Sequence, residues 1–363
     1  MHLLVTGGAG FIGSHFVRSV LADRLPGLEG ASITVLDKIA WAGNFANLGP
    51  VAESRRLDFV PADVGDAPVV GAALRGHDAV VHFAASHGGA DVAGIEILLA
   101  AALRHDVARF LHVSTDQVYG SIETGAWHER SPLAPSTPDA AAKAGCDLMA
   151  LAYHRAHDLP VVVTRSSDNY GPYQHPWRTV PRLVTSLLDG RPAPPPGDRV
   201  RDWLHVDDHC QGLALALLEG RPGEIYHIAG SLELAERDLT DLIQAELGLT
   251  RNRFEPPAAE PRWDRAEPVG LEPRWDRAEP VGLEPGWDRA EPVGPMPGWG
   301  RVEPPVAGPG RDGKAGDRRR ALDDDKIRRE LGWRPHIEFT AGLASTIAWY
   351  REHPRWWRAL LSE

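Results

Sequence analysis

The fold is decided by one stretch near the N-terminus, His2-Leu3-Leu4-Val5-Thr6-Gly7-Gly8-Ala9-Gly10-Phe11-Ile12-Gly13. A short apolar run, typical of a buried parallel strand, ends in three glycines spaced three residues apart, and a helical pattern follows at once. Gly7 permits a tight turn, Gly10 lets the backbone approach a pyrophosphate, and Gly13 lets the helix pack closely on the strand. The stretch therefore predicts a strand-turn-helix unit that binds a dinucleotide at the helix N-terminus. A purely structural glycine turn is the alternative.

An acidic residue at the end of the next predicted strand indicates which dinucleotide is bound. Residues 33–36 form a second apolar run, and Asp37 follows it, 24 positions after Gly13. A carboxylate at this place accepts a hydrogen bond from a ribose 2′-hydroxyl and repels a 2′-phosphate, so it favours NAD over NADP. Lys38, directly after Asp37, keeps NADP open as an alternative.

Further apolar runs continue the alternation of strands and helical stretches, at residues 58–60, 79–85, 110–115 and 161–165. This alternation predicts an α/β fold, a Rossmann-type doubly wound parallel sheet. Ligands bind at the carboxyl ends of such strands, which would gather Gly10, Ala84, Thr115 and Ser166 into one cleft. The expected cofactor contacts are Gly7, Gly10, Phe11, Ile12, Gly13, Asp37, Lys38, Asp63, Val64, Ala84 and Ala85.

Composition narrows the class of protein and its partners. The chain has 363 residues, 43% of them hydrophobic, and a formal net charge of −11, which argues against nucleic acid or an anionic membrane as a partner. Cys146 and Cys210 build no disulfide framework and lack metal-ligand spacing, so no metal site is expected. A predicted strand begins at residue 3, which leaves no room for a signal peptide, and no apolar run reaches about 18 residues. We therefore expect a soluble, cytoplasmic protein.

Several motifs resemble those of one enzyme family. The most specific is Val113-Ser114-Thr115-Asp116-Gln117-Val118-Tyr119-Gly120-Ser121, and others lie at residues 36–38 with 42–44, 169–174, 201–209, 324–327 and 349–351. They are similar to motifs of the dTDP-glucose 4,6-dehydratases, which are extended short-chain dehydrogenases/reductases of deoxysugar biosynthesis. The likeness runs from residue 1 to about 250 and resumes near about 315.

The resemblance implies a nucleotide-sugar protein with two domains. It implies an NAD-binding Rossmann domain at residues 1–165, joined by part of 200–225, and a smaller C-terminal substrate-binding domain made mainly of residues 166–363. It further implies NAD as the cofactor, a dTDP-sugar as the ligand and a homodimer as the assembly. The reaction would be loss of water from a dTDP-hexose to give the 4-keto-6-deoxy sugar, with NAD holding the hydride of the sugar C4 in between.

The catalytic groups that the resemblance implies are only partly present. Thr115 would hydrogen-bond the sugar O4, Asp116 would protonate the leaving hydroxyl, and Lys143 would contact the cofactor and activate a tyrosine phenol. That tyrosine belongs four residues before the lysine, where this chain has Asp139, and no Tyr-x-x-x-Lys occurs anywhere in the sequence. Gln117 stands where the family has the glutamate that takes the C5 proton, and an amide does not titrate. Asp139 would be either a weak replacement base or half of an ordinary helix pair with Lys143.

The residues that the resemblance assigns to the nucleotide sugar are His87, Asn169, Arg178, Arg201 and Arg319. Arg201 and Arg319 are candidates for clamping the diphosphate, because a guanidinium presents two donors to phosphate oxygens. The chain departs from the family's pattern at Trp177-Arg178, at His227, at Gly316 and in a short segment after His87. These departures indicate either a specialised substrate preference or relaxed constraint.

One segment has no counterpart in the family. A unit of twelve residues recurs from Glu260 onward and is marked by Trp263, Trp275, Trp287 and, in a degraded copy, Trp299. Two prolines per unit exclude a continuous helix or a central strand. We expect residues 256–312 to be a Pro/Trp repeat insertion that is disordered or polyproline-like, and a Trp/Pro interaction module is the alternative.

The sequence leaves two functions open. In the first, the protein is a working lyase, or a related sugar-nucleotide enzyme such as an epimerase, for which Thr115, Asp116 and Lys143 suffice. In the second, it is a non-catalytic binding or dimer-partner protein that keeps the fold and has lost the chemistry. Asp139 and Gln117 are the positions that discriminate between them.

Overall fold

The computed structural model describes residues 1–39, 43–85, 90–230, 232–249 and 318–361. Its strands are β1 (His2–Thr6), β2 (Ser32–Leu36), β3 (Leu57–Val60), β4 (Ala79–His82), β5 (Arg109–Thr115), β6 (Val161–Ser166), β7 (Asp168–Tyr170), β8 (Val200–His205), β9 (Ile225–Ile228), β10 (Leu232–Ala235) and β11 (Arg319–Arg320). Its helices are α1 (Phe11–Leu21), η1 (Phe45–Val51), α2 (Ala67–Ala73), α3 (Ala90–Arg104), η2 (Asp116–Tyr119), α4 (Pro138–His157), α5 (Thr179–Leu188), α6 (Val206–Glu219), α7 (Glu236–Glu246), α8 (Asp325–Leu331), α9 (Phe339–Glu352) and α10 (Pro354–Leu361). The repeat insertion predicted at residues 256–312 lies outside the described residues.

A parallel sheet of seven strands lies at the centre of the fold, in the order β3-β2-β1-β4-β5-β6-β9. β1 pairs with β2 on one side and with β4 on the other, so the strand order reverses there. Open α/β sheets bind ligands at such a switch point. The predicted Rossmann-type doubly wound sheet is therefore confirmed. The strand predicted at 79–85 ends earlier, at His82, because its partner β1 turns away at Gly7.

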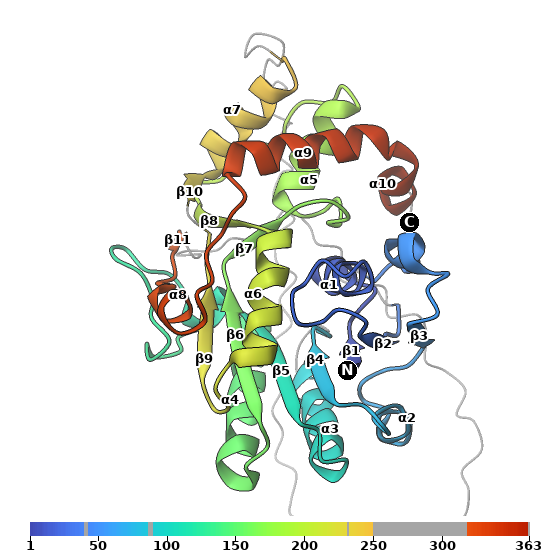
Figure 1. Cartoon of the computed structure of the whole chain (residues 1–363). Helices are drawn as coiled ribbons and strands as arrows, with labels where there is room; N and C mark the ends of the chain where they lie inside the picture. The colour runs from blue at the N-terminus through green and yellow to red at the C-terminus, as the bar shows by residue number, and fades with distance from the viewer. Residues whose placement is uncertain (40–42, 86–89, 231, 250–317, 362–363) are drawn as a thin grey trace, which may run out of the picture. The chain divides into compact units, whose positions relative to one another are not determined.

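Helices cover both faces of this sheet (Figure 1). Leu3 and Val5 of β1 belong to the buried cluster that α1 and α6 complete on one face. Leu4 belongs to the cluster that α2, α3 and α4 complete on the other face. Successive side chains of a strand point to opposite faces, so a strand covered on both sides is apolar at every position. This explains the uninterrupted apolar runs in the sequence.

A second sheet carries a third buried cluster. β8 pairs with β7 and β11 in parallel and with β10 antiparallel. Helices α5, α7, α9 and α10 pack here, and the core includes Tyr170, Trp203, Phe339, Tyr350 and Trp357. The three clusters belong to one compact unit, Met1–Phe254 with Ala315–Glu363, and the domain boundary near residue 165 stays a prediction.

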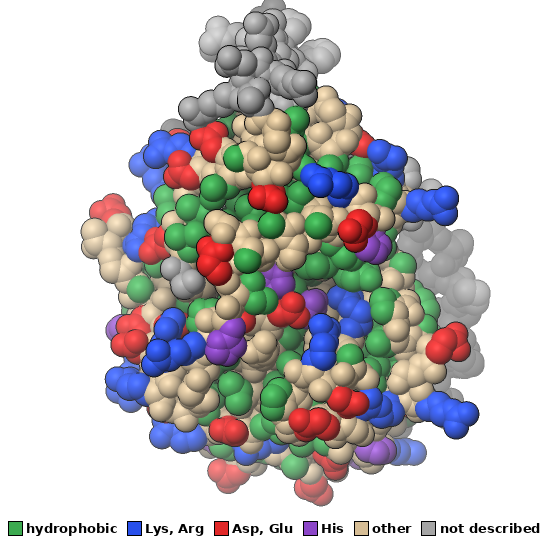
Figure 2. Space-filling view, turned by 45° about the horizontal axis from the view of Figure 1, so that its top comes forward, with side chains coloured by type: hydrophobic (Ala, Val, Ile, Leu, Met, Phe, Trp, Pro, Cys, Tyr) green, Lys and Arg blue, Asp and Glu red, His purple; other side chains and the backbone are tan. Residues whose placement is uncertain are grey.

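The surface carries charges of both signs. Figure 2 shows Lys and Arg side chains interspersed with Asp and Glu side chains across the face in view. Within the described ranges, none of the helices combines the length and the apolar character needed to cross a membrane.

Candidate active site

The glycine turn lies at the switch point of the central sheet. Gly7 has a φ of +71°, and a Cβ there would lie 2.6 Å from the backbone nitrogen of Ala84, so only glycine fits. A Cβ on Gly13 would clash with the carbonyl oxygen of Gly7. Gly10 is the N-cap of α1, and within the described residues no side chain caps this helix, so its first N–H groups can bind an anion. These residues fit the pyrophosphate of a dinucleotide.

Asp37 directly follows β2 and is oriented by two backbone donors. Its Oδ2 accepts from the N–H of Ala9 at 2.9 Å, and its Oδ1 accepts from the N–H of Ile39 at 2.8 Å. A carboxylate accepts about four hydrogen bonds, so capacity remains for ribose hydroxyls. The bond to Ala9 ties the carboxylate to the glycine turn, where a ribose next to the pyrophosphate would lie.

Lys38 and Asp63 are paired with each other. The Lys38 Nζ lies 2.8 Å from Asp63 Oδ2, and both side chains are exposed. The hydrogen bonds from Lys38 and from the N–H of Gly65 lower the pKa of Asp63. Because Lys38 already neutralises Asp63, it offers less charge to a 2′-phosphate, which favours NAD over NADP.

The other expected cofactor contacts lie at the start of α1 and after strands β3 and β4. Phe11 and Ile12 form the start of α1 and are half-buried. Ala84 and Ala85 follow β4, with Ala84 against Gly7. Val64, after β3, is half-buried and packs against Gly94 of α3.

Thr115 and Asp116 lie where β5 runs into the short helix η2. The Thr115 Oγ1 accepts from the N–H of Gln117 at 3.4 Å and donates to Asp116 Oδ1 at 3.2 Å. Asp116 is only 2% exposed. Since β5 lies beside β4 in the parallel sheet, this junction shares a sheet edge with Ala84 and the glycine turn.

Asp116 belongs to a cluster of charges that the sequence motifs did not reveal. Arg320 Nε donates to Asp116 Oδ2 at 2.9 Å, and Arg320 Nη2 donates to Asp168 Oδ2 at 2.7 Å. Arg201 Nε lies 3.2 Å from the same oxygen of Asp168. Burial raises the pKa of Asp116 to about 6, although the charge of Arg320 opposes this and that of Asp168 adds to it. A buried carboxyl with this pKa can hold a proton near neutral pH and donate it.

Arg319 and Arg320 are neighbours on β11 with different partners. Successive side chains of a strand face opposite ways. Arg320 points inward to Asp116, whereas Arg319 donates to both carboxylate oxygens of Glu233 at 2.7 and 2.8 Å. The resemblance to the family implies a role for Arg319 at the diphosphate, whereas the structure brings Arg320 to Asp116. A strand of two residues is too short for an alternating pattern to show in the sequence.

Helix α4 carries Asp139 and Lys143. Thr137 caps its N-terminus by accepting from the N–H of Ala140 at 3.2 Å, and Pro138 follows as the first helical residue. Asp139 is exposed in the first turn, where a carboxylate interacts favourably with the helix dipole. Lys143, one turn further along, is half-buried. The position of Asp139 is thus explained without a catalytic role, and a role as replacement base stays a prediction.

The remaining residues expected to hold substrate differ in their surroundings. Asn169 Nδ2 donates to the carbonyl oxygen of Ser167 at 2.9 Å, and its Oδ1 accepts from His209 Nδ1 at 2.9 Å. Burial lowers the pKa of His209 to about 3, so this histidine is neutral. Arg178 is exposed at the N-cap of α5. His87 lies outside the described residues.

A buried polar network contacts η2 through Tyr119. Asp147 of α4 is 0% exposed and accepts from His112 Nε2 at 3.1 Å and from Arg165 Nε at 2.8 Å. Arg165 also donates to the hydroxyl of Tyr119, the last residue of η2. Burial raises the pKa of Tyr119 to about 12. The network therefore holds neutral Tyr119, and with it the helix that begins at Asp116.

His227 completes the network, and its tautomer follows from its neighbours. Its Nδ1 lies 2.8 Å from the carbonyl oxygen of Asp323, which can only accept, so Nδ1 carries the hydrogen. Its Nε2 then accepts from the Tyr119 hydroxyl at 2.7 Å. Burial lowers the pKa of His227 to about 3, in agreement with a neutral ring. His227, a departure from the family's pattern, is thus hydrogen-bonded through both ring nitrogens.

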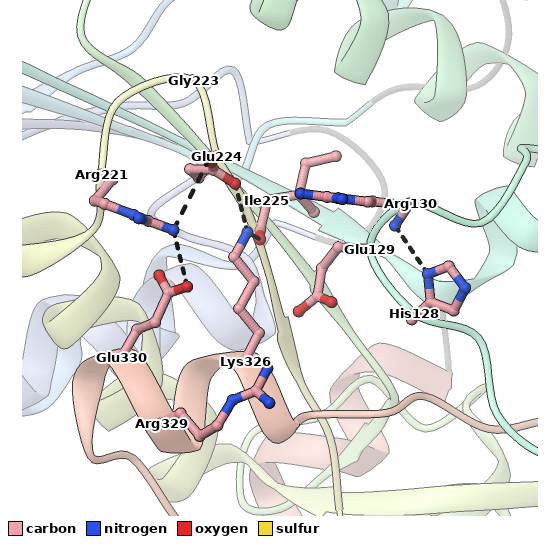
Figure 3. Close-up of a pocket in the computed structure, with 10 residues that line it drawn as sticks. All are labelled: His128, Glu129, Arg130, Arg221, Gly223, Glu224, Ile225, Lys326, Arg329 and Glu330. Atoms are coloured by element: carbon pink, nitrogen blue, oxygen red, sulfur yellow. Dashed lines mark hydrogen bonds and ion pairs between the residues drawn. The ribbon is translucent and has the colours of Figure 1, made fainter.

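A charged pocket of about 310 Å³ lies at the amino end of β9 (Figure 3). β9 is an edge strand, whose outward backbone groups need partners. Glu129 accepts from the N–H of His227 at 3.2 Å, and Lys326 donates to the carbonyl oxygen of Ile225 at 2.6 Å. Lys326 is also paired with Glu224 at 2.7 Å. These charges are explained by the strand edge, and they lie away from the carboxyl ends that carry the candidate site.

The described residues contain no group of three or more His, Cys, Asp or Glu side chains that could hold a metal ion. The candidate site is instead made of a glycine turn, an acidic strand end, and a Thr-Asp pair at the same sheet edge. These features define a dinucleotide-binding protein of the Rossmann class.

Comparison with known proteins assigns the chain to a family. The family profile described as GDP-mannose 4,6 dehydratase matches residues 4–259. The dTDP-glucose 4,6-dehydratase of Streptomyces niveus is 43% identical over 100% of this chain and 96% of its own length. The crystal structure of dTDP-glucose 4,6-dehydratase from Streptomyces venezuelae with NAD bound has a TM-score of 0.81 and 44% identity, and covers 99% of this chain and 100% of that one. The Bacillus anthracis enzyme in complex with NAD has a TM-score of 0.79 and 32% identity, and covers 99% of both chains.

The chain belongs to the dTDP-glucose 4,6-dehydratase family, as its motifs predicted. The expected cofactor also agrees with the NAD present in these solved relatives.

Proposed function

We propose that the protein binds NAD and a dTDP-hexose and catalyses a dTDP-glucose 4,6-dehydratase-like reaction at reduced efficiency. The observation that carries this proposal is the Thr115–Asp116 pair at the carboxyl end of β5, on the same sheet edge as the glycine turn. The names of the relatives supply the substrate class.

The chain's own residues provide binding and one proton donor. Bound NAD would supply transient storage of the C4 hydride. The Thr115 hydroxyl would hold the sugar O4, and Asp116, with its pKa raised to about 6, would protonate the departing C6 hydroxyl. Gln117 cannot take the C5 proton because an amide does not titrate. Removal of the C5 proton is therefore the step that limits turnover.

When the nucleotide sugar binds, its diphosphate would replace the carboxylates that are now paired with Arg201 and Arg319. Arg201 is paired with Asp168, and Arg319 is paired with Glu233. Phosphate oxygens can replace a carboxylate as the acceptor of a guanidinium's two donors. The role of both arginines as diphosphate clamps is part of this proposal.

The direct test is incubation of the purified protein with NAD and dTDP-glucose. We expect dTDP-glucose binding measurable by calorimetry, and slow formation of the 4-keto-6-deoxy product measurable by chromatography. Absence of binding would contradict the assigned ligand. Rapid turnover would show that another residue removes the C5 proton.

A second function, a non-catalytic binding or dimer-partner protein, is favoured by one observation. Asp116 is 2% exposed and held by Arg320, so its carboxyl is not open to solvent. In this case the protein would bind dTDP-glucose without any product, even over long incubation. The homodimer expected from the resemblance would be tested in the same samples by light scattering.

Replacing Asp37 by Ala is expected to weaken NAD binding by about 1–3 kcal/mol, because the ribose loses a hydrogen bond to a charged acceptor. Asp58→Ala, on the neighbouring strand β3, is the control and should leave the affinity unchanged. Titration of both variants with NAD and with NADP measures the effect. Tighter binding of NADP than NAD by the unmodified protein would contradict the assignment.

Replacing Gly13 by Ala is expected to abolish most NAD binding, because the new methyl group would clash with the carbonyl oxygen of Gly7 and push α1 away from β1. The matched control is Gly71→Ala in α2, where a Cβ meets nothing within 4 Å and stability should rise by about 0.5–1 kcal/mol. NAD titration and thermal unfolding are measured on both. Full NAD affinity in Gly13→Ala would place the pyrophosphate elsewhere.

A further inference from the structure

One buried guanidinium is shared between two carboxylates at the candidate site. Arg320 reaches Asp116 through Nε at 2.9 Å and Asp168 through Nη2 at 2.7 Å. The side chains of Arg320 and Asp116 are 7% and 2% exposed, so this ion pair is shielded from water. The Asp168 side chain is 30% exposed and so retains contact with solvent.

The charged groups that surround Asp116 in the described part of the chain come from three strands. Arg320 approaches from β11, Asp168 from β7, and Arg201 with Asp202 from β8. On its own segment, Thr115 donates to the other carboxylate oxygen, Oδ1, at 3.2 Å. Asp202 is a buried carboxyl, and its charge and that of Asp116 disfavour each other.

These contacts act on the proton of Asp116 in opposite directions. The guanidinium of Arg320 favours the carboxylate form, since an opposite charge at hydrogen-bond distance stabilises the ionised state. Asp168 takes up part of the same guanidinium charge and adds a negative charge nearby, so it favours the protonated form. Arg201 in turn neutralises part of Asp168. The way in which the charge of Arg320 is divided between Asp116 and Asp168 therefore determines whether Asp116 holds a proton.

We propose that Arg320 is the positioning residue that sets the protonation of Asp116, and that Asp168 tunes it by competing for the same guanidinium. Arg320 holds the carboxyl in place through Nε, and Asp168 prevents it from fixing Asp116 permanently as a carboxylate. The inference rests on the proposed function only where it names Asp116 as the acid that protonates the leaving hydroxyl.

The test measures the protonation of Asp116 without any substrate. Infrared spectra of the full-length protein are recorded across a pH series, and the band of the protonated carboxyl is assigned with Asp116→Asn. We expect Arg320→Met to raise the midpoint of this titration by about 1–3 pH units, because the stabilising cation is lost. We expect Asp168→Asn to lower the midpoint, because Arg320 then no longer shares its charge with a carboxylate at position 168. Arg320→Lys should shift the midpoint less than Arg320→Met.

Arg318→Met is the matched control. Arg318 directly precedes β11 and its side chain is exposed, so the midpoint should not move. Circular dichroism checks that each variant is folded, and if Arg320→Met is not, Arg320→Lys and Asp168→Asn decide the question. Unchanged midpoints, or shifts of Arg320→Met and Asp168→Asn in the same direction, would overturn the proposal. Because no turnover is measured, these results stand apart from the test for dehydratase activity.

Discussion

Replacing Asp139 by Tyr and Gln117 by Glu in one chain is expected to raise the rate of 4-keto-6-deoxy product formation from dTDP-glucose by about 10²–10⁴-fold. A tyrosine at 139 would stand one helical turn before Lys143 on α4, where the ammonium group favours an ionised phenol. A glutamate at 117 would add a titratable group on η2, next to Asp116. The chain would then hold one residue for each proton transfer. Chromatography of the sugar nucleotides measures the rate.

The single variants separate the two steps. Because both groups act in sequence on one substrate, we expect their effects to be strongly non-additive, with little gain from Gln117→Glu alone. Asp139→Phe with Gln117→Glu is the matched control, since it supplies the aromatic ring without the hydroxyl. A double variant that gains nothing would locate the defect outside these two positions. A gain with phenylalanine would mean that packing, and not the phenol, limits the reaction.

Replacing Asp147 by Ala is expected to cost about 3–5 kcal/mol of unfolding free energy, because it leaves Arg165 buried without its carboxylate and removes the partner of His112. Urea unfolding measures this loss. Asp189→Ala is the control, because Asp189 pairs with two arginines whose side chains are more than half exposed, and such pairs contribute about 1 kcal/mol or less. Equal losses in the two variants would contradict the importance of the buried network.

The lowered pKa of Asp147 predicts that the protein loses stability at low pH. Burial would raise the pKa of Asp147, but the hydrogen bond from His112 and the charge of Arg165 more than offset it and lower the pKa. A carboxyl with a lowered pKa contributes stability above its unfolded value of about 3.9, and the contribution is lost as the pH falls through the folded value. Asp147→Ala should therefore differ least from the unmodified protein at low pH.

Much of the fold could be predicted from local patterns in the sequence. The glycine turn could be predicted because it and Asp37 interact within the first strands and the helix between them. The uninterrupted apolar runs could be predicted because their strands are covered on both faces of the sheet. Their residue types are dictated by backbone geometry and burial. The family followed from the motif around Thr115. The local pattern also identified Asp139 and Gln117 as departures, because those positions are defined by their spacing from Lys143 and Thr115.

Only the tertiary structure decided which charges meet Asp116 and Tyr119. Arg320 reaches Asp116 because β11 pairs with β8 in a register that places it opposite Arg201. Asp168 joins them because β7 pairs with the same strand. Arg319 and Arg320 face opposite ways because they are neighbours on β11, and no spacing rule in the sequence connects either arginine to Asp116. Such contacts depend on strand register between distant segments, so residue identity becomes informative only after the strands have paired.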